Sequence, residues 1–598
     1  MSLIVQKFGG TSVANPEMIL SAARKAIRAQ QQGNQVLMVV SAMGKQTDQL
    51  VDLASQITHR PSAREMDMLL STGEQVSVAL MAMAIHSLGY KAVSLTGAQI
   101  GIRTDASHTK ARILSISTER LQHLLDAGHI VIAAGFQGID EQMNITTLGR
   151  GGSDTTAVAL AAVIQARSCE IFTDVDGVYT TDPRLLPEAS KVEQISYDEM
   201  LELASLGASV MHNRSIEFAK KYGVPIHVRS ATSDATGSWI TSEPCPSERP
   251  VCGAALTEDE ARISVLGVPD KPGVSLEIFS AVAARNVTVD MIVQNISEQG
   301  HADLSFTVPS NELGVSLAAI EGALQALGAG RVTYDEHVCK VSVVGLGMAE
   351  QTGVAEKMFA ILAAEDINIQ MISTSEIKVS VLVDQDVAIL ALRAAHRAFE
   401  LEKELPPRPA GPPPGARVAD AADVAEQLQE VGMEELVLDD ITLDTSQGRV
   451  TISGLPDIPG VATRVFHEIA AGGIVVDMIV QGHDSHADDA SLSFTVPKEH
   501  VTAAEAIAQR LAQEFTCRGV SSWSDIAKLS VSGVGLRSNT SVAVRTFRAL
   551  AEAEINVDMV STSEVRVNVV VDGSAGPRGL ESLRRAFSDL LHGSDPAK

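Results

Sequence analysis

The sequence contains few aromatic side chains and few cysteines. Phe, Trp and Tyr make up 3% of the 598 residues, which leaves too few rings for a nucleic-acid stacking platform. Five cysteines are scattered along the chain without a C-x-x-C pair: Cys169, Cys245, Cys252, Cys339 and Cys517. We therefore expect no zinc site and no disulfide framework, and we expect a reduced, cytoplasmic compartment.

Positive charge is scarce as well. With 47 basic and 74 acidic residues the formal net charge is −27, which disfavours nucleic acid and anionic membranes as partners. No run approaches the ~18 consecutive apolar residues of a membrane helix, and Met1 leads directly into a charged strand, so we expect neither a membrane span nor a signal peptide. An anionic substrate must then be held by a locally positive site within a negative protein.

The chain is long enough for about three to five domains. Residues 1–245 alternate apolar strands with helical stretches, which predicts an α/β domain with a largely parallel sheet covered by helices. Ligand sites in such sheets lie at the carboxyl ends of the strands.

Internal repetition dominates the rest of the chain. Val341–Asp384 aligns without gaps with Leu529–Asp572, and Val265–Val308 pairs with Ile452–Val496. This repetition predicts four short units in the order A-B-A-B: unit 1 (260–335), unit 2 (338–402), unit 3 (436–522) and unit 4 (526–593). A proline-rich linker at 403–420 is expected to form an extended spacer between the two pairs.

Two early turns in the first domain have the composition of an anion site. Lys7-Phe8-Gly9-Gly10-Thr11-Ser12 follows an apolar strand and precedes a helix with Asn15 as its expected N-cap, so backbone N–H groups and a lysine point to one place. Ser41–Thr47 ends the next strand with hydroxyls, a glycine and Lys45. An ordinary tight turn is the alternative for each stretch.

A third turn, Thr146–Thr156, places three glycines around Arg150 and runs into an apolar helix. Its N–H groups can form a concave nest, and the arginine can grip a carboxylate or phosphate. The alternative is that Ser153 or Asp154 only caps the helix.

The fourth turn is Phe172–Arg184, where an acidic stretch precedes Tyr179, which can face a base, and Arg184, which can face phosphates. Common turn dipeptides are the alternative. Glu74 opens the helical run Val76–Ala84, where an acid either complements the helix dipole or binds a substrate ammonium. The histidines lack metal-ligand spacing and are interpreted as structural or solvent-facing.

Taken together, the runs Lys7–Ser12, Thr147–Asp154 and Phe172–Arg184 resemble the signature runs of the aspartate kinases, which have the amino acid kinase fold. The four units resemble ACT modules, the ferredoxin-like βαββαβ domains that bind amino acids. Two ACT pairs resemble the duplicated, cyanobacterial-type form of these enzymes.

The resemblance implies ATP-dependent phosphorylation of the L-aspartate side-chain carboxylate to 4-phospho-L-aspartate, the first step towards lysine, threonine, methionine and isoleucine. ATP with Mg²⁺, feedback inhibition by lysine and threonine, and a homodimer are expected. A carboxylate is already ionised at neutral pH and needs no general base, so cations and N–H groups should carry the catalysis.

The site residues follow from the matched runs. The expected catalytic residues are Lys7, Gly10, Arg150 and Asp154, with Asp154 orienting the lysine. The expected aspartate-binding residues are Ser41, Thr47, Glu74, Arg150, Gly151, Gly152 and Ser153. The expected ATP-binding residues are Lys7, Phe8, Gly9, Gly10, Thr173, Asp174, Tyr179, Arg184 and Ser209. No protein ligand of Mg²⁺ is assigned. The sequence departs from the family at Ser209, where relatives often have lysine, and at Asn213, where they often have proline.

The effector sites are expected at the Asp-x-Pro-Gly turns of units 1 and 3, each followed by a helix whose free N–H groups suit a carboxylate. The expected allosteric residues are Asp270, Pro272, Gly273, Val274, Asp290, Gln294, Asn295, Asn368, Asp457, Gly460, Val461, Asp477, Gln481 and Asn556. A simple turn and helix start is the alternative. Units 2 and 4 lack this turn, and Ser541 replaces its glycine in unit 4.

Three other functions compete with this interpretation. Another amino acid kinase, acting on glutamate or acetylglutamate, is disfavoured by the four-unit tail. A kinase joined to a homoserine dehydrogenase is disfavoured because the chain ends in an ACT-like unit. A non-catalytic amino-acid sensor is disfavoured by the intact Lys7, Arg150 and Asp154.

Overall fold

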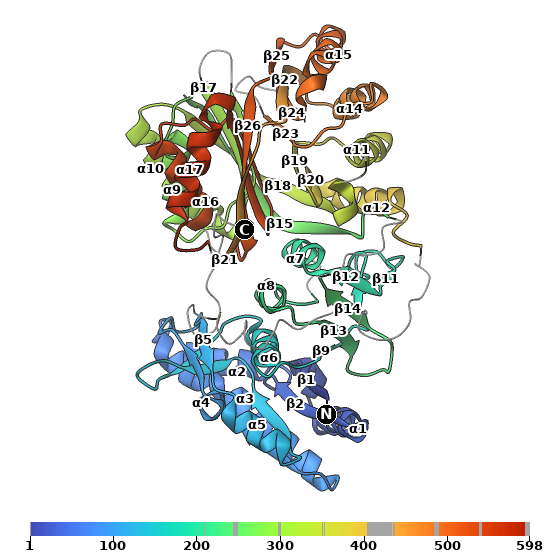
Figure 1. The fold of residues 1–598 in the computed structure, drawn as a ribbon, viewed down its shortest axis with the longest axis vertical. Coiled ribbons are helices and arrows are strands. Elements are labelled where there is room, and N and C mark those ends of the chain that lie inside the picture. Colours follow the sequence, from blue (N-terminus) through green and yellow to red (C-terminus); the bar gives the residue numbers. More distant parts are fainter. Residues whose placement is uncertain are drawn as a thin grey trace, which may run out of the picture.

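The computed structural model describes residues 2–207, 210–242, 249–296, 301–349, 351, 353–403, 433, 437–483, 489–536 and 541–591. Ser209, the side chain of Asn295 and the proline-rich stretch from residue 404 onward lie outside the described residues. The N-terminal domain forms one end of an elongated molecule and the repeated units form the other, with α7 (Tyr197–Ser205) and α8 (Asn213–Tyr222) between them (Figure 1).

The N-terminal domain is built on an eight-stranded sheet of order β12-β14-β13-β9-β1-β2-β6-β3. Its neighbours are parallel except for β13 and β14, which confirms a largely parallel sheet. The strands are β1 (Ser2–Phe8), β2 (Asn34–Val40), β3 (Ala92–Leu95), β6 (Ile130–Ala134), β9 (Ser168–Thr173), β12 (Gln194–Ser196), β13 (Ile226–Ser230) and β14 (Ser238–Thr241).

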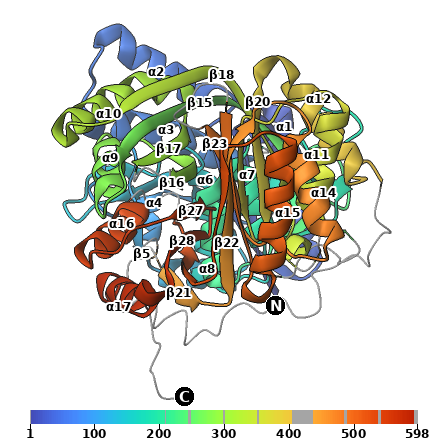
Figure 2. The same cartoon turned by 90° about the horizontal axis from the view of Figure 1, so that it is seen from above.

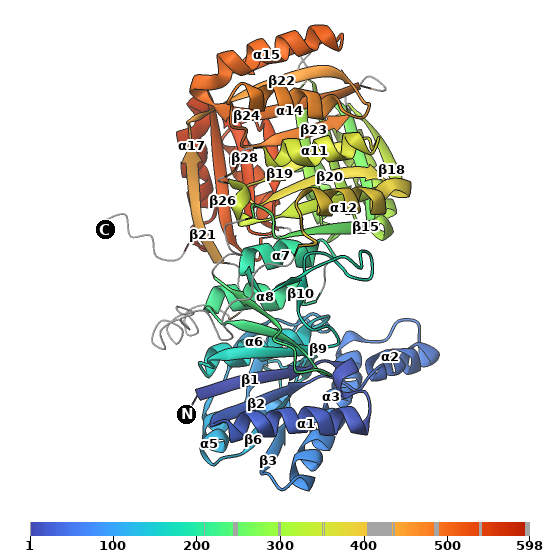
Figure 3. The same ribbon diagram turned by 90° about the vertical axis from the view of Figure 1, so that its right-hand side faces the viewer.

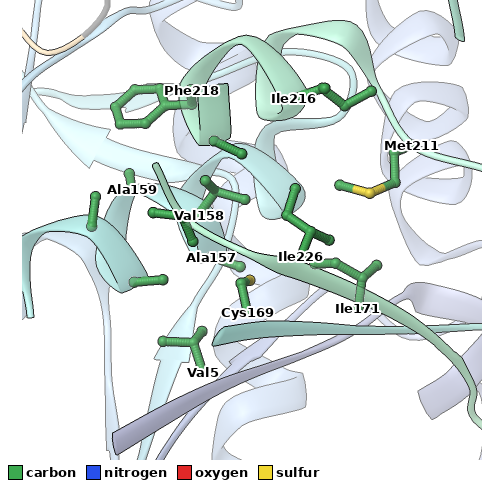
Figure 4. Close-up of a cluster of buried hydrophobic side chains, with 14 of the residues drawn as sticks. Val5, Ala157, Val158, Ala159, Cys169, Ile171, Met211, Ile216, Phe218 and Ile226 are labelled. Carbon is green, nitrogen blue, oxygen red and sulfur yellow. The ribbon is translucent and has the colours of Figure 1, made fainter. Parts of the chain in front are cut away.

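Helices cover both faces of this sheet, because alternate residues of its central strands are apolar on both sides. On β1, Phe8 packs in a cluster with residues of α1 (Pro16–Gln31) and α3 (Ala63–Ser87). Val5 faces the opposite cluster, where Ala157 and Val158 of α6 (Gly152–Val163) lie over the sheet (Figure 4). Asn15 caps α1 as expected, since its side chain accepts from the Met18 N–H at 3.0 Å.

Smaller elements complete the domain. A four-stranded sheet has the order β5-β4-β7-β8, and β10 pairs antiparallel with β11. The remaining bounds are β4 (Ile102–Thr104), β5 (Ile113–Ile116), β7 (Gln137–Ile139), β8 (Ile145–Thr147), β10 (Val178–Tyr179), β11 (Lys191–Val192), α2 (Gln46–Ile57), α4 (Gly97–Ile100) and α5 (Glu119–Asp126).

Helix α3 is long and apolar enough to cross a membrane by length and composition alone. This corrects the expectation that no stretch is of that kind. In the structure 56% of its most apolar 18-residue window is buried inside the domain. The helix also buries the carboxylates of Asp67 and Glu74, so it is a core helix of the kinase-like domain.

The repeated units share a ten-stranded sheet of order β16-β17-β15-β18-β20-β19-β23-β24-β22-β25, beside a four-stranded sheet β21-β26-β28-β27. The strands are β15 (Gly253–Pro269), β16 (Asp290–Ile296), β17 (His301–Val308), β18 (Arg331–Val344), β19 (Met371–Ser375), β20 (Lys378–Asp384), β21 (Val437–Asp444), β22 (Gln447–Pro456), β23 (Ile479–His483), β24 (Asp489–Pro497), β25 (Gly519–Trp523), β26 (Ile526–Val534), β27 (Met559–Thr562) and β28 (Arg566–Asp572). The helices are α9 (Val274–Ala283), α10 (Leu313–Leu327), α11 (Val354–Ala364), α12 (Ala388–Ala398), α14 (Val461–Ala471), α15 (Val501–Glu514), α16 (Ser541–Glu552) and α17 (Gly576–Ala586).

Units 1 and 3 follow the expected β-α-β-β-α-β order. Units 2 and 4 complete their sheets with a strand that precedes the other unit of their pair. The first half of β15, Gly253–Thr257, pairs with β18 in unit 2, and β21 pairs with β26 in unit 4. β21, which the sequence assigned to unit 3, therefore belongs to the sheet of unit 4.

The units of one pair dock on the units of the other. Unit 2 joins unit 3 through hydrogen-bonded β19 and β23, and α11 lies beside α14. Unit 1 packs against unit 4, where α9 lies beside α16 and Phe279 stacks on Phe547 with ring centroids 5.2 Å apart. Figure 2 shows the two helix pairs on opposite sides of the sheets, and Figure 3 shows α7 and α8 beneath the repeated units.

Candidate active site

The first expected anion turn lies at the carboxyl end of β1. Lys7 is 8% exposed, and its Nζ lies 2.5 Å from Oδ1 of Asp154 in the first turn of α6. A side chain at Gly9 would meet that ammonium, because a Cβ there would lie 3.6 Å from Nζ. The structure thus brings together the lysine, the glycine turn and the acidic residue that the sequence predicted to orient the lysine.

The second expected turn is joined to the first. The Ser41 N–H donates to the Phe8 carbonyl at 3.1 Å, and the Gly44 N–H donates to the Gly10 carbonyl at 3.0 Å. Only glycine fits at position 10, since a Cβ would lie 2.7 Å from the Ala42 carbonyl oxygen. Ser41 follows β2 and Thr47 lies in the first turn of α2, so both stand at this edge of the sheet.

Glu74 lies in the middle of α3 rather than at a helix start, so the helix-dipole interpretation of this residue is wrong. It is 3% exposed, and its Oε1 accepts from the Ala42 N–H at 3.1 Å. The buried Oε2 has no hydrogen-bond partner in the part of the chain that the structure describes. Burial raises the pKa of Glu74 to about 7, although the hydrogen bond from Ala42 opposes the shift. A buried, unsatisfied carboxylate oxygen next to the second turn suits a ligand cation.

The glycine-rich turn begins α6. Gly149 and Gly151 have φ of +77° and +72°, a region that favours glycine, and Gly151 is the N-cap without a side-chain cap. The alternative that Ser153 or Asp154 caps this helix is therefore wrong. Arg150 projects to solvent from the tip of the turn, where its guanidinium can meet an arriving anion. The Gly152 and Asp154 N–H groups donate within the turn, to the Gly149 and Gly151 carbonyls at 3.0 and 3.1 Å, and the dipole of α6 adds positive character at its start.

Sequence reasoning missed the residue that positions this turn. Asp67 on α3 is fully buried and accepts from the Thr147 hydroxyl at 2.5 Å, from the Thr109 N–H at 3.0 Å and from Nδ1 of His108 at 2.6 Å. It ties the strand that leads into Gly149 to the helix that carries Glu74. A single aspartate in a helix gives no pattern in the sequence, so nothing there identified it.

A second missed contact comes from α8. The Arg214 guanidinium donates to the carbonyl of Leu148 and, at 2.6 Å, to the carbonyl of Ala111. A Cβ at Gly151 would lie 2.4 Å from the Cβ of His212, so this histidine packs directly on the glycine-rich turn. Burial lowers the pKa of His212, so its imidazole favours the neutral form. His212 is structural, as expected, and it packs beside the candidate active site.

The expected nucleotide residues are less closely gathered. Phe8 is fully buried and stacks on Phe172 with centroids 4.6 Å apart, so its side chain is not available to ATP. Thr173 ends β9 and donates to Asp174 at 3.0 Å. The Arg184 side chain is 85% exposed, and its guanidinium is held by Asp182, with a shortest contact of 2.6 Å.

Tyr179 lies on the β10 hairpin and donates from its hydroxyl to Asp176 at 2.6 Å. Burial, with the carboxylate of Asp176 beside it, raises the pKa of Tyr179 to about 12. Its ring is therefore fixed by its own loop rather than by the glycine turns.

Two buried carboxylates on α7 contact the repeated units: Glu199 accepts from the Leu346 N–H of unit 2 at 3.0 Å, and Glu202 contacts units 2 and 4. Glu202 on α7 is fully buried, and its Oε2 lies 2.9 Å from Nζ of Lys378 in unit 2. Its Oε1 accepts from the Glu564 N–H of unit 4 at 2.8 Å. Glu564 also accepts from the Asn213 amide, at 3.5 Å, and Asn213 directly follows His212. A polar path thus connects both B-type units with the glycine-rich turn.

The expected effector turns meet a neighbouring unit. Asp270 accepts from the Asn556 amide at 2.7 Å, and Asp457 accepts from the Asn368 amide at 2.9 Å. Gln294 donates to the Val557 carbonyl at 2.6 Å, and Gln481 donates to the Ile369 carbonyl at 3.0 Å. Gly273 and Gly460, with φ of +95° and +90°, begin the helices that follow.

A pocket of about 390 Å³ at the junction of units 2 and 3 contains Asn368, Asp457 and Gln481, and we call it the polar pocket. Asp290 and Asp477, expected among the allosteric residues, instead pair with lysines. Asp290 binds Lys340 at 2.6 Å, and Asp477 binds Lys528.

The chain matches known families over most of its length. The amino acid kinase family matches residues 2–230, and ACT domains match 261–324, 341–399, 450–515 and 529–587. An aspartate kinase of Stutzerimonas stutzeri is 51% identical over 404 residues, which cover 67% of this chain and 98% of the relative. Aspartokinase 2 of Bacillus subtilis is 50% identical over 404 residues, which cover 67% and 99%.

Solved structures agree with these relatives. The aspartate kinase from Synechocystis is 40% identical, with a TM-score of 0.52 over 98% of each chain. Aspartokinase III of E. coli, solved with aspartate and ADP, shares the fold with a TM-score of 0.58 and 24% identity, over 67% of this chain and all of that one. The amino acid kinase match, the ACT matches and the relatives at about 50% identity show that this chain belongs to the aspartate kinase family, which phosphorylates L-aspartate with ATP.

Proposed function

We propose that the γ-phosphoryl group of ATP is transferred to the aspartate side chain at the carboxyl edge of β1 and β2, with Lys7 as the principal cation. The observation that carries this proposal is the Lys7–Asp154 pair at 2.5 Å, buried beside Gly9 and at the start of α6. Asp154 fixes the ammonium over the glycine turn, where the charge of the moving phosphoryl group develops. Preorganised cations and N–H groups are the main source of catalysis in such transfers.

Substrate aspartate is held between two elements. Glu74 receives the substrate ammonium at its free Oε2, and Arg150 with the N–H group of Gly151 receives the carboxylates, next to Gly152. Ser41, Thr47 and Ser153 line the same edge. The reaction needs no general base, so the main task of these residues is to position the two anions against each other.

Arg184 binds the nucleotide phosphates, which compete with Asp182 for its guanidinium. Tyr179 and Thr173 flank the base and the ribose. Magnesium is proposed to arrive with the ATP phosphates and to take few of its ligands from the protein. Asp154 and Asp174 are the carboxylates that would approach it. When bound, the ion neutralises the phosphate charge.

Lysine and threonine are the proposed effectors, bound where the turns of units 1 and 3 meet Asn556 and Asn368. The carboxylate of an amino acid suits the helix starts after Gly273 and Gly460, and its ammonium suits Asp270 or Asp457. Both junctions involve a B-type unit that contacts Glu202, which supports a route from effector to active site.

The proposal also includes a homodimer in the cytoplasm. Helices α2 and α3 expose an apolar stripe that a second copy would cover: Leu53, Ile57, Val76, Leu80 and Met83. Light scattering on the intact chain tests this point, and a purely monomeric mass at micromolar concentration would contradict it.

The reaction is tested by trapping the acyl phosphate with hydroxylamine in the presence of ATP and L-aspartate, with L-glutamate as the control substrate. We expect activity with aspartate only, and its loss in Lys7→Ala. Equal activity in both proteins would refute the role of Lys7. No activity in the intact chain would favour the amino-acid sensor.

A further inference from the structure

One face of α3 is buried and polar where the helix passes the candidate active site. Asp67, Ser71 and Glu74 are four and seven residues apart, so they lie on the same side of the helix. All three residues are buried. Further along, the same face is apolar and joins the core through Val78 and Met81. Because a buried polar group costs free energy unless it is hydrogen-bonded, the partners of this face identify its role.

The later part of the polar face holds the second turn. The Ala42 N–H donates to Glu74 at 3.1 Å, and a Cβ at Gly73 would lie 2.8 Å from the Cβ of Ala42. Only glycine fits at position 73, so the helix and the second turn are in direct contact. The Glu74 Oε2 that has no partner among the described residues lies at this end of the face.

The earlier part of the polar face holds the strand pair that leads into the glycine-rich turn. Gln137 of β7 and Thr147 of β8 are partners in the antiparallel ladder, and both bond to α3. The Gln137 amide donates to the Ser71 carbonyl at 3.0 Å, and the Thr147 hydroxyl donates to Asp67 at 2.5 Å. The approach to Gly149 is thus bonded to the helix at two positions about one turn apart.

Asp67 also holds the loop that packs against this turn. The Thr109 N–H donates to both carboxylate oxygens of Asp67, at 3.0 and 3.1 Å, and Thr109 has φ of +67°, a region rare for residues other than glycine. A Cβ at Gly149 would lie 2.9 Å from the Thr109 carbonyl oxygen. Asp67 therefore fixes the position of Gly149 from two sides, through Thr147 and through Thr109.

We propose that Asp67 is a positioning residue that sets the separation between the two ends of the aspartate site and so determines its preference for aspartate over glutamate. Seven residues of helix, a rise of about 10 Å, separate Asp67 from Glu74. Helix α3 is therefore a rigid spacer between the ammonium end at Glu74 and the carboxylate end at Gly149–Gly151. Glutamate is longer by one methylene, and a site of fixed length discriminates against one methylene by about 10- to 200-fold.

The matched variants are two neighbouring threonines. Thr147→Val keeps the shape of the side chain and removes the hydroxyl that donates to Asp67. Thr146→Val is the control, because Thr146 is also fully buried but its hydroxyl bonds to that of Thr104, at 2.6 Å, instead of to α3. Thr147→Ser keeps the hydroxyl and should behave as the parent does.

Steady-state kinetics of aspartate phosphorylation by the intact chain, with L-glutamate as a competitive inhibitor, test the proposal. We expect Thr147→Val to raise KM for aspartate about tenfold and to lower the ratio of the glutamate inhibition constant to that KM at least fivefold. KM for ATP should stay within twofold of the parent. Asp67→Asn should act in the same direction and more strongly, since an amide N–H₂ replaces one of the acceptor oxygens.

Equal changes in Thr147→Val and Thr146→Val would overturn the proposal, because the loss of any buried hydroxyl would then have the same effect. Glutamate that competes no better with aspartate in Thr147→Val than in the parent would overturn it as well.

The role of Asp67 rests on the proposed function, in which Glu74 binds the ammonium and the glycine-rich turn binds the carboxylates. Glu74→Gln separates the two. An unchanged KM for aspartate in Glu74→Gln would contradict the proposed function itself. A raised KM in Glu74→Gln, with Thr147→Val equal to the parent, would contradict only the role of Asp67.

Discussion

The catalytic domain and the repeated units position their functional side chains by different means. Lys7 lies at the end of β1 and Asp154 in the first turn of α6, so both positions are fixed by the fold of one domain. The residue pairs that we propose for the effectors join separate units: Asn556 and Asp270 are 286 residues apart in the chain. A site within one sheet exists whenever the domain is folded, whereas a site between units exists only when the units are docked. An effector bound at such a junction would therefore be linked to the docking of the units, because it would bind only the docked state.

Removing the carboxylate charge that links the two regions should have the largest effect on stability. In Glu202→Gln the buried Lys378 loses its acidic partner, and we expect the free energy of unfolding to fall by about 3 kcal/mol. Lysine inhibition should weaken in parallel. Chemical unfolding followed by circular dichroism measures the first effect.

Glu400→Gln is the matched control, since its ion pair with Lys403 at 2.8 Å is exposed on both sides and should contribute little to the free energy of unfolding. Equal destabilisation by the two variants would show that Glu202 has no special role.

Asp154→Asn should lower kcat about a hundredfold, roughly 2.7 kcal/mol of transition-state stabilisation, because the Lys7 ammonium loses the carboxylate that holds it over Gly9. KM for ATP and aspartate should change little. Steady-state kinetics test this split, and a kcat within threefold of the parent would contradict the orienting role.

Much of the arrangement of the candidate active site could be predicted from the sequence, because its turns are local. Lys7, Gly9 and Gly10 form one continuous run, and the glycines around Arg150 form another. The burial of the Phe8 side chain could have been predicted as well, since successive strand residues face opposite sides and a neighbour of Lys7 points into the core.

The junctions could not be predicted in the same way. Glu202 and Glu564 lie 362 residues apart, and no local pattern marks either as an interface residue. Asp290 and Asp477 recur in a repeated motif, which suggested an effector role, but the motif is repeated because each buried lysine beside it requires a carboxylate. β21 pairs with β26 of unit 4, and no local pattern in the sequence predicts such a long-range pairing.

Aspartate binding should depend on pH through Glu74. The pKa of Glu74 is raised to about 7, so the folded protein holds this proton between pH 4.5 and 7 and the unfolded chain does not. Ionisation of Glu74 therefore lowers stability, by about 3 kcal/mol once the pH exceeds 7.

Only the ionised form binds the substrate ammonium, so KM for aspartate should fall about tenfold per pH unit towards pH 7 and then level off. Glu74→Gln should have a higher KM that no longer varies with pH over this range. A KM of the parent enzyme that is constant from pH 5.5 to 8.5 would contradict the assignment.

The smallest effects are expected at the effector turns. Asp457→Asn and Asp270→Asn each remove one carboxylate facing an amide of the opposite unit, and each should weaken its effector about five- to tenfold while kcat stays unchanged. Titration with lysine and threonine separately would show which junction binds which effector. A loss of basal activity in either variant would mean that docking itself, rather than binding, had been disturbed.

The most direct test of the central claim is single-turnover phosphoryl transfer in Lys7→Ala, with binding of ADP and L-aspartate measured on the same preparation. The account predicts binding within about threefold of the parent and a transfer rate reduced about a thousandfold or more, roughly 4 kcal/mol. An unchanged transfer rate, or a slow rate explained entirely by lost binding, would contradict the role of Lys7 as the cation that stabilises the moving phosphoryl group.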